Sequence, residues 1–335
     1  MLAGLRHINF IHNSLSENDW PLDIERLLTY NPSIMKKHVD TILDKIGNTP
    51  LLQLIRIRPK NSHVKIYYKA EWYNPGGSIK DRPALRMILE AEKQGLLTHD
   101  KILIDSSSGN TAIAYAMICA AKGYKCKVVM PANISVERKV MVGAYGAEII
   151  YTDPLEGSDG AIRKAKELYQ LNPDIYYMPD QYNNIFNPLA HEENTAREIW
   201  EQTEGEVTHF AACIGTSGTI IGTSRGLKRF NAKIKTFAIE PENALHGLEG
   251  MKHMASSIVP GIYKKEELDG VIPVPTEASY DMVKRLALEE GLLVGQSSGA
   301  ALIGALQLAE KLDYGIIVTI FCDGGDKYLS TRIWD

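Results

Sequence analysis

The chain has 335 residues, of which 44% are hydrophobic and 23% are charged, and its formal net charge is −4. This composition is typical of a globular protein with a substantial core, and the negative balance argues against a nucleic-acid partner, which would be bound through Lys and Arg. No apolar stretch reaches the roughly 18 residues that span a bilayer, so no membrane partner is expected.

Residues 1–40 differ in character from the remainder of the chain. Polar, turn-forming runs such as Ser16-Glu17-Asn18-Asp19 surround one short amphipathic segment, Leu22–Leu28. We predict an N-terminal extension over residues 1–40.

From about Lys65 onward, strand-like and helix-like segments alternate. The predicted strands are Lys65–Ala70, Ile102–Asp105, Cys126–Met130, Glu148–Tyr151, Ile175–Met178, Phe210–Ile214, Thr236–Ile239, Leu292–Val294 and Ile316–Phe321. The predicted helices are Pro83–Gln94, Thr111–Lys122, Gly160–Gln170, Met282–Glu290 and Ala300–Leu312. Several strands are continuous apolar runs, as expected where both faces are covered. The alternation predicts an α/β fold with open, mostly parallel sheets and helices on both faces.

The four cysteines show no arrangement typical of a metal site. They are Cys119, Cys126, Cys213 and Cys322, and they form no C-x-x-C pair. We therefore expect free thiols, a reducing cytoplasmic location and no metal.

Three loops rich in Gly, Ser and Thr each follow a predicted strand and precede a helix. They are Ser106–Thr111, Gly215–Thr219 and Gly295–Gly299. Unpaired N–H groups and the helix dipole attract anions and cofactors at such positions. One loop of this kind is often only a tight turn, whereas three in one chain indicate a binding site.

The sequence gives little support to a nucleotide-binding protein or a serine hydrolase. Neither G-x-x-x-x-G-K-[ST] nor G-x-G-x-x-G is present. Gly295–Gly299 does match the hydrolase pattern G-x-S-x-G, but that pattern requires a later histidine and the last histidine is His253. We therefore exclude a serine hydrolase.

The segment Asn74–Pro83 reads Asn-Pro-Gly-Gly-Ser-Ile-Lys-Asp-Arg-Pro and places Lys80 at the start of a predicted helix. The helix dipole disfavours a protonated amine there, and Schiff-base chemistry needs the unprotonated form. Taken alone, Lys80 would more simply be an exposed lysine beside Asp81.

Together with six further segments, Asn74–Pro83 resembles the β-family (fold type II) of pyridoxal-phosphate enzymes, and cysteine synthases (O-acetylserine sulfhydrylases, B-type) in particular. The other segments are Ile46–Leu51, Ser108–Thr111, Asp180–Asn184, Gly215–Thr219, Gly295–Gly299 and Asp323–Thr331. The resemblance implies two open, twisted sheets like those of the tryptophan synthase β-subunit. It further implies a smaller, mobile, substrate-closing domain at 74–184, a larger phosphate-binding domain at 41–73 plus 185–335, and a homodimer.

The resemblance also implies roles for individual residues around pyridoxal 5′-phosphate. Lys80 would form the Schiff base and move the α-proton, Asn110 would bond the cofactor's 3′-oxygen, and Ser297 would meet the pyridine nitrogen. Five residues would hold the phosphate: Gly215, Thr216, Ser217, Gly218 and Thr219. Four would hold the substrate carboxylate: Ser107, Ser108, Thr111 and Gln181. Each could instead be an ordinary cap or turn residue.

The implied reaction is a β-replacement that makes L-cysteine from an activated serine and sulfide through an α-aminoacrylate intermediate. O-acetyl-L-serine is the favoured donor. Lys252 could instead pair with the phosphate of O-phosphoserine or be a solvated loop residue. Cystathionine- or diaminopropionate-forming replacement stays open, as does a non-catalytic cofactor-binding scaffold.

Overall fold

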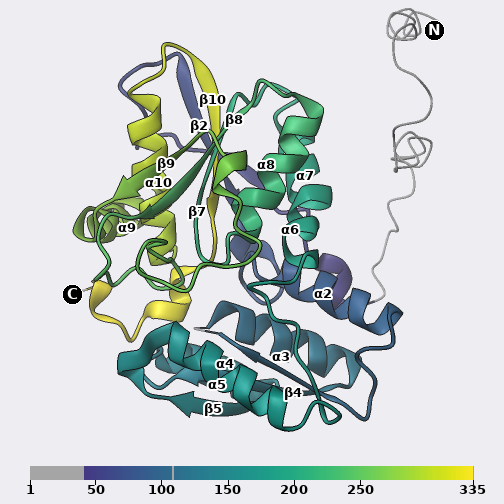
Figure 1. Ribbon diagram of the computed structural model, residues 1–335. Coiled ribbons are helices and arrows are strands. Elements are labelled where there is room, and N and C mark those ends of the chain that lie inside the picture. The colour runs from purple at the N-terminus through teal and green to yellow at the C-terminus, as the bar shows by residue number, and fades with distance from the viewer. Residues whose placement is uncertain (1–40, 108, 335) are drawn as a thin grey trace, which may run out of the picture. The chain divides into compact units, whose positions relative to one another are not determined.

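Two sheets organise the chain in the computed structural model, which describes residues 41–107 and 109–334 (Figure 1). The larger sheet has six strands in the order β1 (Leu51–Gln53), β2 (Val64–Ala70), β10 (Gly315–Phe321), β7 (His209–Cys213), β8 (Lys235–Pro241), β9 (Gly270–Val274). The smaller sheet has four, in the order β5 (Glu148–Thr152), β4 (Lys125–Pro131), β3 (Ile102–Ser106), β6 (Tyr176–Tyr177). Among these strands of the described residues, only β1 runs antiparallel to its neighbour. The predicted extension at 1–40 and Ser108 lie outside the described residues.

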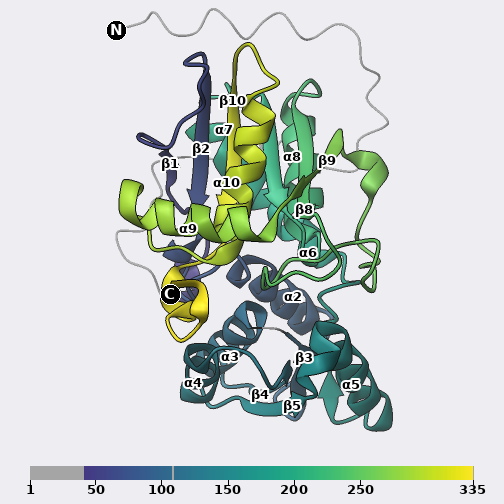
Figure 2. The same cartoon turned by 90° about the vertical axis from the view of Figure 1, so that its left-hand side faces the viewer.

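Helices cover both faces of each sheet, as the continuous apolar strands require (Figure 2). On the larger sheet, α9 (Thr276–Glu290) and α10 (Gln296–Ala309) pack on one face, and α7 (Ala196–Gln202) and α8 (Gly218–Phe230) on the other. On the smaller sheet, α2 (Asp81–Lys93), α3 (Asn110–Lys122) and α4 (Val136–Ala144) face α5 (Gly157–Leu171) across the strands. The predicted fold class is thereby confirmed.

Shorter helices connect these layers. Between β6 and α7 lie α6 (Phe186–Ala190) and a π-helical turn, η4 (His191–Thr195). The 3₁₀ turns are η1 (Ile42–Lys45), η2 (Glu71–Tyr73), η3 (Pro154–Glu156), η5 (Lys265–Glu267), η6 (Gly325–Tyr328) and η7 (Arg332–Trp334). Within the described ranges, no helix has the length and apolar character needed to cross a membrane.

One predicted strand is wrong. Leu292–Val294 is not part of a ladder, and Val294 makes only a single bridge to Gly324. The nearby strand β10 already pairs with β2 on one edge and with β7 on the other, so no edge is left for another strand. As a result the Ser297 loop follows an extended connection, and Ser297 lies in the first turn of α10.

The parallel strands bring distant loops together at the carboxyl ends of the strands. The loops that follow β3, β7 and β10 begin at residues 107, 214 and 322. All four strands of the smaller sheet fall within 74–184, and all six strands of the larger sheet fall outside it.

Candidate active site

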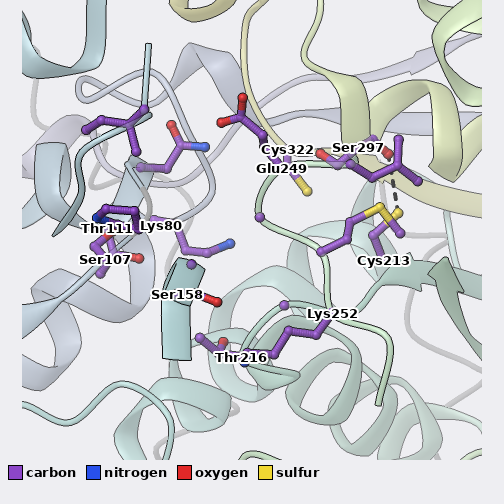
Figure 3. Close-up of a pocket in the computed structure, with 18 of the residues that line it drawn as sticks. Lys80, Ser107, Thr111, Ser158, Cys213, Thr216, Glu249, Lys252, Ser297 and Cys322 are labelled. Atoms are coloured by element: carbon purple, nitrogen blue, oxygen red, sulfur yellow. Dashed lines mark hydrogen bonds between the residues drawn. The ribbon is translucent and has the colours of Figure 1, made fainter. Parts of the chain in front are cut away.

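A cavity of about 430 Å³ collects nearly all of the predicted site residues. It is lined by Lys80, Ser107, Asn110, Thr111, Gln181, Gly215, Thr216, Ser217, Thr219, Lys252 and Ser297. Gly218 lies between two lining residues as the first residue of α8, and Ser108 lies outside the described residues. Figure 3 shows the Lys80 amine directed into this pocket.

Lys80 is the N-cap residue of α2, and the turn before it is firmly held. The Lys327 ammonium donates to the carbonyls of Gly76 and Gly77 at 3.0 and 2.6 Å. The Gly76 N–H donates to the Asp81 carboxylate at 2.5 Å. Burial raises the pKa of Asp81 to about 7, although this hydrogen bond and the Lys327 charge oppose the rise. These contacts fix the backbone from which the Lys80 side chain extends.

A buried ionic network lies directly behind this turn. Arg82 bonds Glu71 and Glu198 at 2.8 and 2.6 Å, and Lys69 bonds Glu198 at 2.7 Å. Burial alone would raise the pKa of Glu198, but the hydrogen bond and charge of Arg82, together with Lys69, lower it to about 2. The network therefore keeps its charges and ties α2 to β2 and α7.

The loop after β7 has the geometry of an anion site. Ser217 adopts φ +71°, and α8 begins at the next residue, so N–H groups at the start of the helix face the loop. The buried Ser217 hydroxyl has no hydrogen-bond partner in the described part of the chain. A Cβ at Gly218 would lie 1.9 Å from the Asn187 side-chain oxygen, so a glycine is needed there.

The loop after β3 presents hydroxyl and amide groups. The Ser107 hydroxyl accepts N–H bonds from Gly109 and Ala112 at 3.0 Å each and keeps its own proton to donate. The Thr111 hydroxyl donates to the Gln181 oxygen at 2.8 Å, and the Gln181 nitrogen donates to the Ser106 carbonyl at 2.6 Å. One Gln181 N–H is left for a ligand.

The wall around Ser297 carries two thiols rather than acids. Cys213 donates to the Ser297 carbonyl at 3.3 Å, and Cys322 also lines the cavity. Burial raises the pKa of Cys322 to about 11 and that of Cys213 well above its ordinary value. Both thiols are therefore neutral at pH 7. Across residues 41–107 and 109–334 no group of His, Cys, Asp and Glu could hold a metal ion.

Lys252 is not a solvated loop residue. It is 5% exposed, its ammonium pairs with Asp159 in the first turn of α5 at 2.8 Å, and it lies 5.4 Å from the centre of the Tyr182 ring. A second ion pair joins Arg138 of α4 to Glu249. Both pairs connect the smaller sheet's helices to the loop that contains residues 246–252.

Several residues at the site received no role from the sequence. Asp159, Glu249 and Asp323 each bind a residue of the cavity wall. Asp323 lies within a segment that carried the family resemblance, which was the one available signal. The partners of the other two are distant in sequence, so no local pattern revealed them.

Comparisons with known proteins show the family to which the chain belongs. The family pattern described as "Pyridoxal-phosphate dependent enzyme" matches residues 42–323. The chain is 49% identical to a cysteine synthase of Aquifex aeolicus over 89% of this chain and 93% of that protein. It is 40% identical to cysteine synthase B of Escherichia coli over 88% and 96% of the two chains. Its fold is similar to the crystal structure of a cysteine synthase from Entamoeba histolytica, with a TM-score of 0.84, 36% identity, and coverage of 90% and 92%.

Proposed function

Because the chain belongs to the family of pyridoxal-phosphate-dependent enzymes, we propose that it is a cysteine synthase whose reaction takes place in the cavity around Lys80. The predicted family, its B-type cysteine synthase relatives and the pyridoxal-phosphate cofactor are all confirmed. One observation carries the assignment of the site. A lysine at a helix start shares one cavity with an anion-binding loop at the start of another helix, α8.

The residues present fit the cofactor. The unpartnered Ser217 hydroxyl and the N–H groups at the start of α8 suit a phosphate, and the cavity extends from there past Lys80 to Ser297. We assign the phosphate to Gly215–Thr219, the 3′-oxygen to Asn110 and the pyridine nitrogen to Ser297. The cofactor, when bound, withdraws electrons from the substrate α-carbon.

Lys80 would carry the cofactor and move the α-proton, because it is the lysine that the anion-binding loop and Ser297 surround. A well-placed general base of this kind contributes roughly 10²–10⁴-fold to a rate. Ser297, flanked by two neutral thiols, offers a hydroxyl rather than a carboxylate at its position. A hydroxyl does not hold a proton on a ring nitrogen, which favours elimination at the β-carbon over transamination.

Ser107, Thr111 and Gln181 would hold the substrate carboxylate, together with the predicted Ser108. The free Ser107 hydroxyl proton and the free Gln181 N–H are donors of the kind that a carboxylate needs. Since these residues lie on or beside the smaller sheet, substrate binding would draw residues 74–184 toward the larger domain.

For the donor, the structure favours O-acetylserine over O-phosphoserine. The Lys252 charge is already neutralised by Asp159, so a phosphate dianion would have to compete with a carboxylate. Homocysteine or ammonia-like nucleophiles, giving cystathionine or diaminopropionate, are the remaining alternatives for the second substrate.

Absorption spectroscopy of the purified protein tests the proposal. Addition of O-acetylserine should change the cofactor's visible band rapidly, and sulfide should restore it with release of cysteine. O-phosphoserine should act more slowly. Lys80→Ala should abolish the change, whereas Lys164→Ala, at a surface lysine of α5, should retain it. A protein that shows the cofactor's band but no change with either donor would instead be a non-catalytic scaffold.

From the resemblance we also propose a cytoplasmic homodimer. Light scattering should give twice the chain mass of 37.2 kDa, and small-angle scattering should show compaction when the donor is added. A monomeric mass, or identical scattering with and without donor, would contradict the dimer or the domain movement respectively.

A further inference from the structure

The segment after β10, residues 322–328, touches both halves of the site. The Ile79 N–H donates to the Cys322 carbonyl at 2.9 Å, and Lys327 holds the turn before Lys80. Asp323 reaches across to Asn110 at the start of α3. The segment therefore determines where two residues of the proposed cofactor site stand relative to each other.

Asp323 is a fully buried acid, with 0% of its surface exposed. One carboxylate oxygen accepts from the Asn110 side-chain nitrogen at 2.7 Å and from the Tyr328 hydroxyl at 2.6 Å. Burial lowers the pKa of Lys327, and the charge of Asp323 opposes this lowering. The pKa of Arg138 is raised despite burial, chiefly by Glu249 and to a smaller extent by Asp323, so the acid has cationic neighbours. A Cβ at Gly295 would lie 2.1 Å from the other Asp323 oxygen, which shows how tightly the carboxylate is enclosed.

These contacts fix the orientation of the Asn110 amide. The Asn110 nitrogen donates to the Asp323 oxygen, and the Asn110 oxygen can only accept, so the nitrogen is the atom that faces Asp323. The Asn110 oxygen is buried and has no partner among the described residues. Because Asn110 lines the cavity and its oxygen is closed off, the group that it can offer to a ligand is its second N–H.

We propose that Asp323 is a positioning residue, which holds the Asn110 amide so that an N–H, rather than a carbonyl, faces the cofactor. The proposal rests on the role assigned to Asn110 above. A donor at the cofactor's 3′-oxygen stabilises that oxygen in its deprotonated form. If the amide turned by 180°, two acceptors would face each other. Tyr328 supports the arrangement by occupying the same oxygen of Asp323.

A double-mutant cycle on the holoenzyme tests this, with Asp323→Ala, Asn110→Ala and the double variant. The readouts are the absorption spectrum of the bound cofactor and its dissociation constant, measured without substrate. Asp323→Ala should move intensity from the visible band to the near-ultraviolet band and weaken cofactor binding about tenfold, as expected for loss of one charge-assisted hydrogen bond. In the Asn110→Ala background, the same substitution should have little further effect.

Three controls separate the outcomes. Asp323→Asn keeps the side-chain size if the alanine variant does not fold, and it should give a shift of the same sign. Asp326→Ala removes an exposed acid of the same segment and should leave both readouts unchanged. If Asp323→Ala acts equally in both backgrounds, or not at all while Asn110→Ala acts, the positioning role is refuted. If Asn110→Ala itself changes neither readout, the assignment of Asn110 to the cofactor fails instead.

Discussion

Replacement of Gly222 by alanine tests whether the close approach of α8 to α6 holds the proposed phosphate-binding loop, Gly215–Thr219, in place. Gly222 is buried in α8, three residues after Thr219. A Cβ there would lie 2.0 Å from the Pro188 carbonyl oxygen and 2.9 Å from the His191 Cβ. A carbon–oxygen contact is normally no shorter than about 3.2 Å, so α8 would have to move by about 1 Å.

The Pro188 carbonyl oxygen belongs to the backbone of α6, so it cannot swing aside as a flexible side chain would. Overpacking of this kind typically costs about 1–3 kcal/mol, and we expect the upper end. The higher helix propensity of alanine offsets up to about 1 kcal/mol of this cost. The expected net loss is about 2 kcal/mol of unfolding free energy, together with weaker cofactor binding because the start of α8 is displaced.

Gly143→Ala provides the matched control. Gly143 also lies in a helix, α4, but apart from its chain neighbours and the backbone of α4 itself, no atom of the described residues comes within 4 Å of the position that an alanine methyl group would occupy. That variant should be as stable as the parent or slightly more stable. Urea unfolding followed by tryptophan fluorescence, and cofactor titration, measure both effects. If Gly222→Ala and Gly143→Ala give the same urea midpoint and the same cofactor affinity, the packing argument is wrong.

Three further predictions concern charges. Burial raises the pKa of Asp81 from 3.8 to about 7, so folding favours its protonated form. The unfolding free energy should therefore fall by roughly 4 kcal/mol as the pH rises from about 4 to above 7. Asp81→Asn should therefore raise the melting temperature at pH 8 but not at pH 4, and equal shifts at both would contradict this. Glu198→Gln should lower the unfolding free energy by about 3–5 kcal/mol, because two buried cations lose a carboxylate partner; an unchanged urea midpoint would refute it. Asp159→Asn frees Lys252 and should raise kcat/KM for O-phosphoserine about tenfold with little change for O-acetylserine, whereas equal changes for both donors would show that the pair does not select the donor.

Much of the fold could be predicted because buried parallel strands leave a strong local signal. Strand β10 is apolar except for Thr319, and the predicted bounds of β4 and β10 differ from the observed ones by one residue at each end or less. The edge strands β1 and β9 were missed, since one has three residues and the other contains Pro273. Leu292–Val294 was wrongly assigned because a local pattern cannot show whether a neighbouring strand has a free edge.

The predicted site residues lie together for a related reason. The loops that follow parallel strands meet at one edge, so residues chosen one loop at a time converge on one cavity. The residues that hold them in place could not be found in this way. Asn110 and Asp323 are separated by 213 positions, and Lys252 and Asp159 by 93, and only the folded chain brings each pair together.

The contacts across the cavity differ in how readily they can open. The side chains of Asp159 and Glu249 are 26% and 31% exposed, so their ion pairs with Lys252 and Arg138 are partly screened by water and each stabilises the observed arrangement only weakly. The Asn110–Asp323 bond is enclosed, and breaking it would leave a buried carboxylate with one partner fewer. The proposed movement of residues 74–184 would therefore open the pairs to Asp159 and Glu249 first, while the Asn110–Asp323 bond holds the start of α3 against the segment after β10.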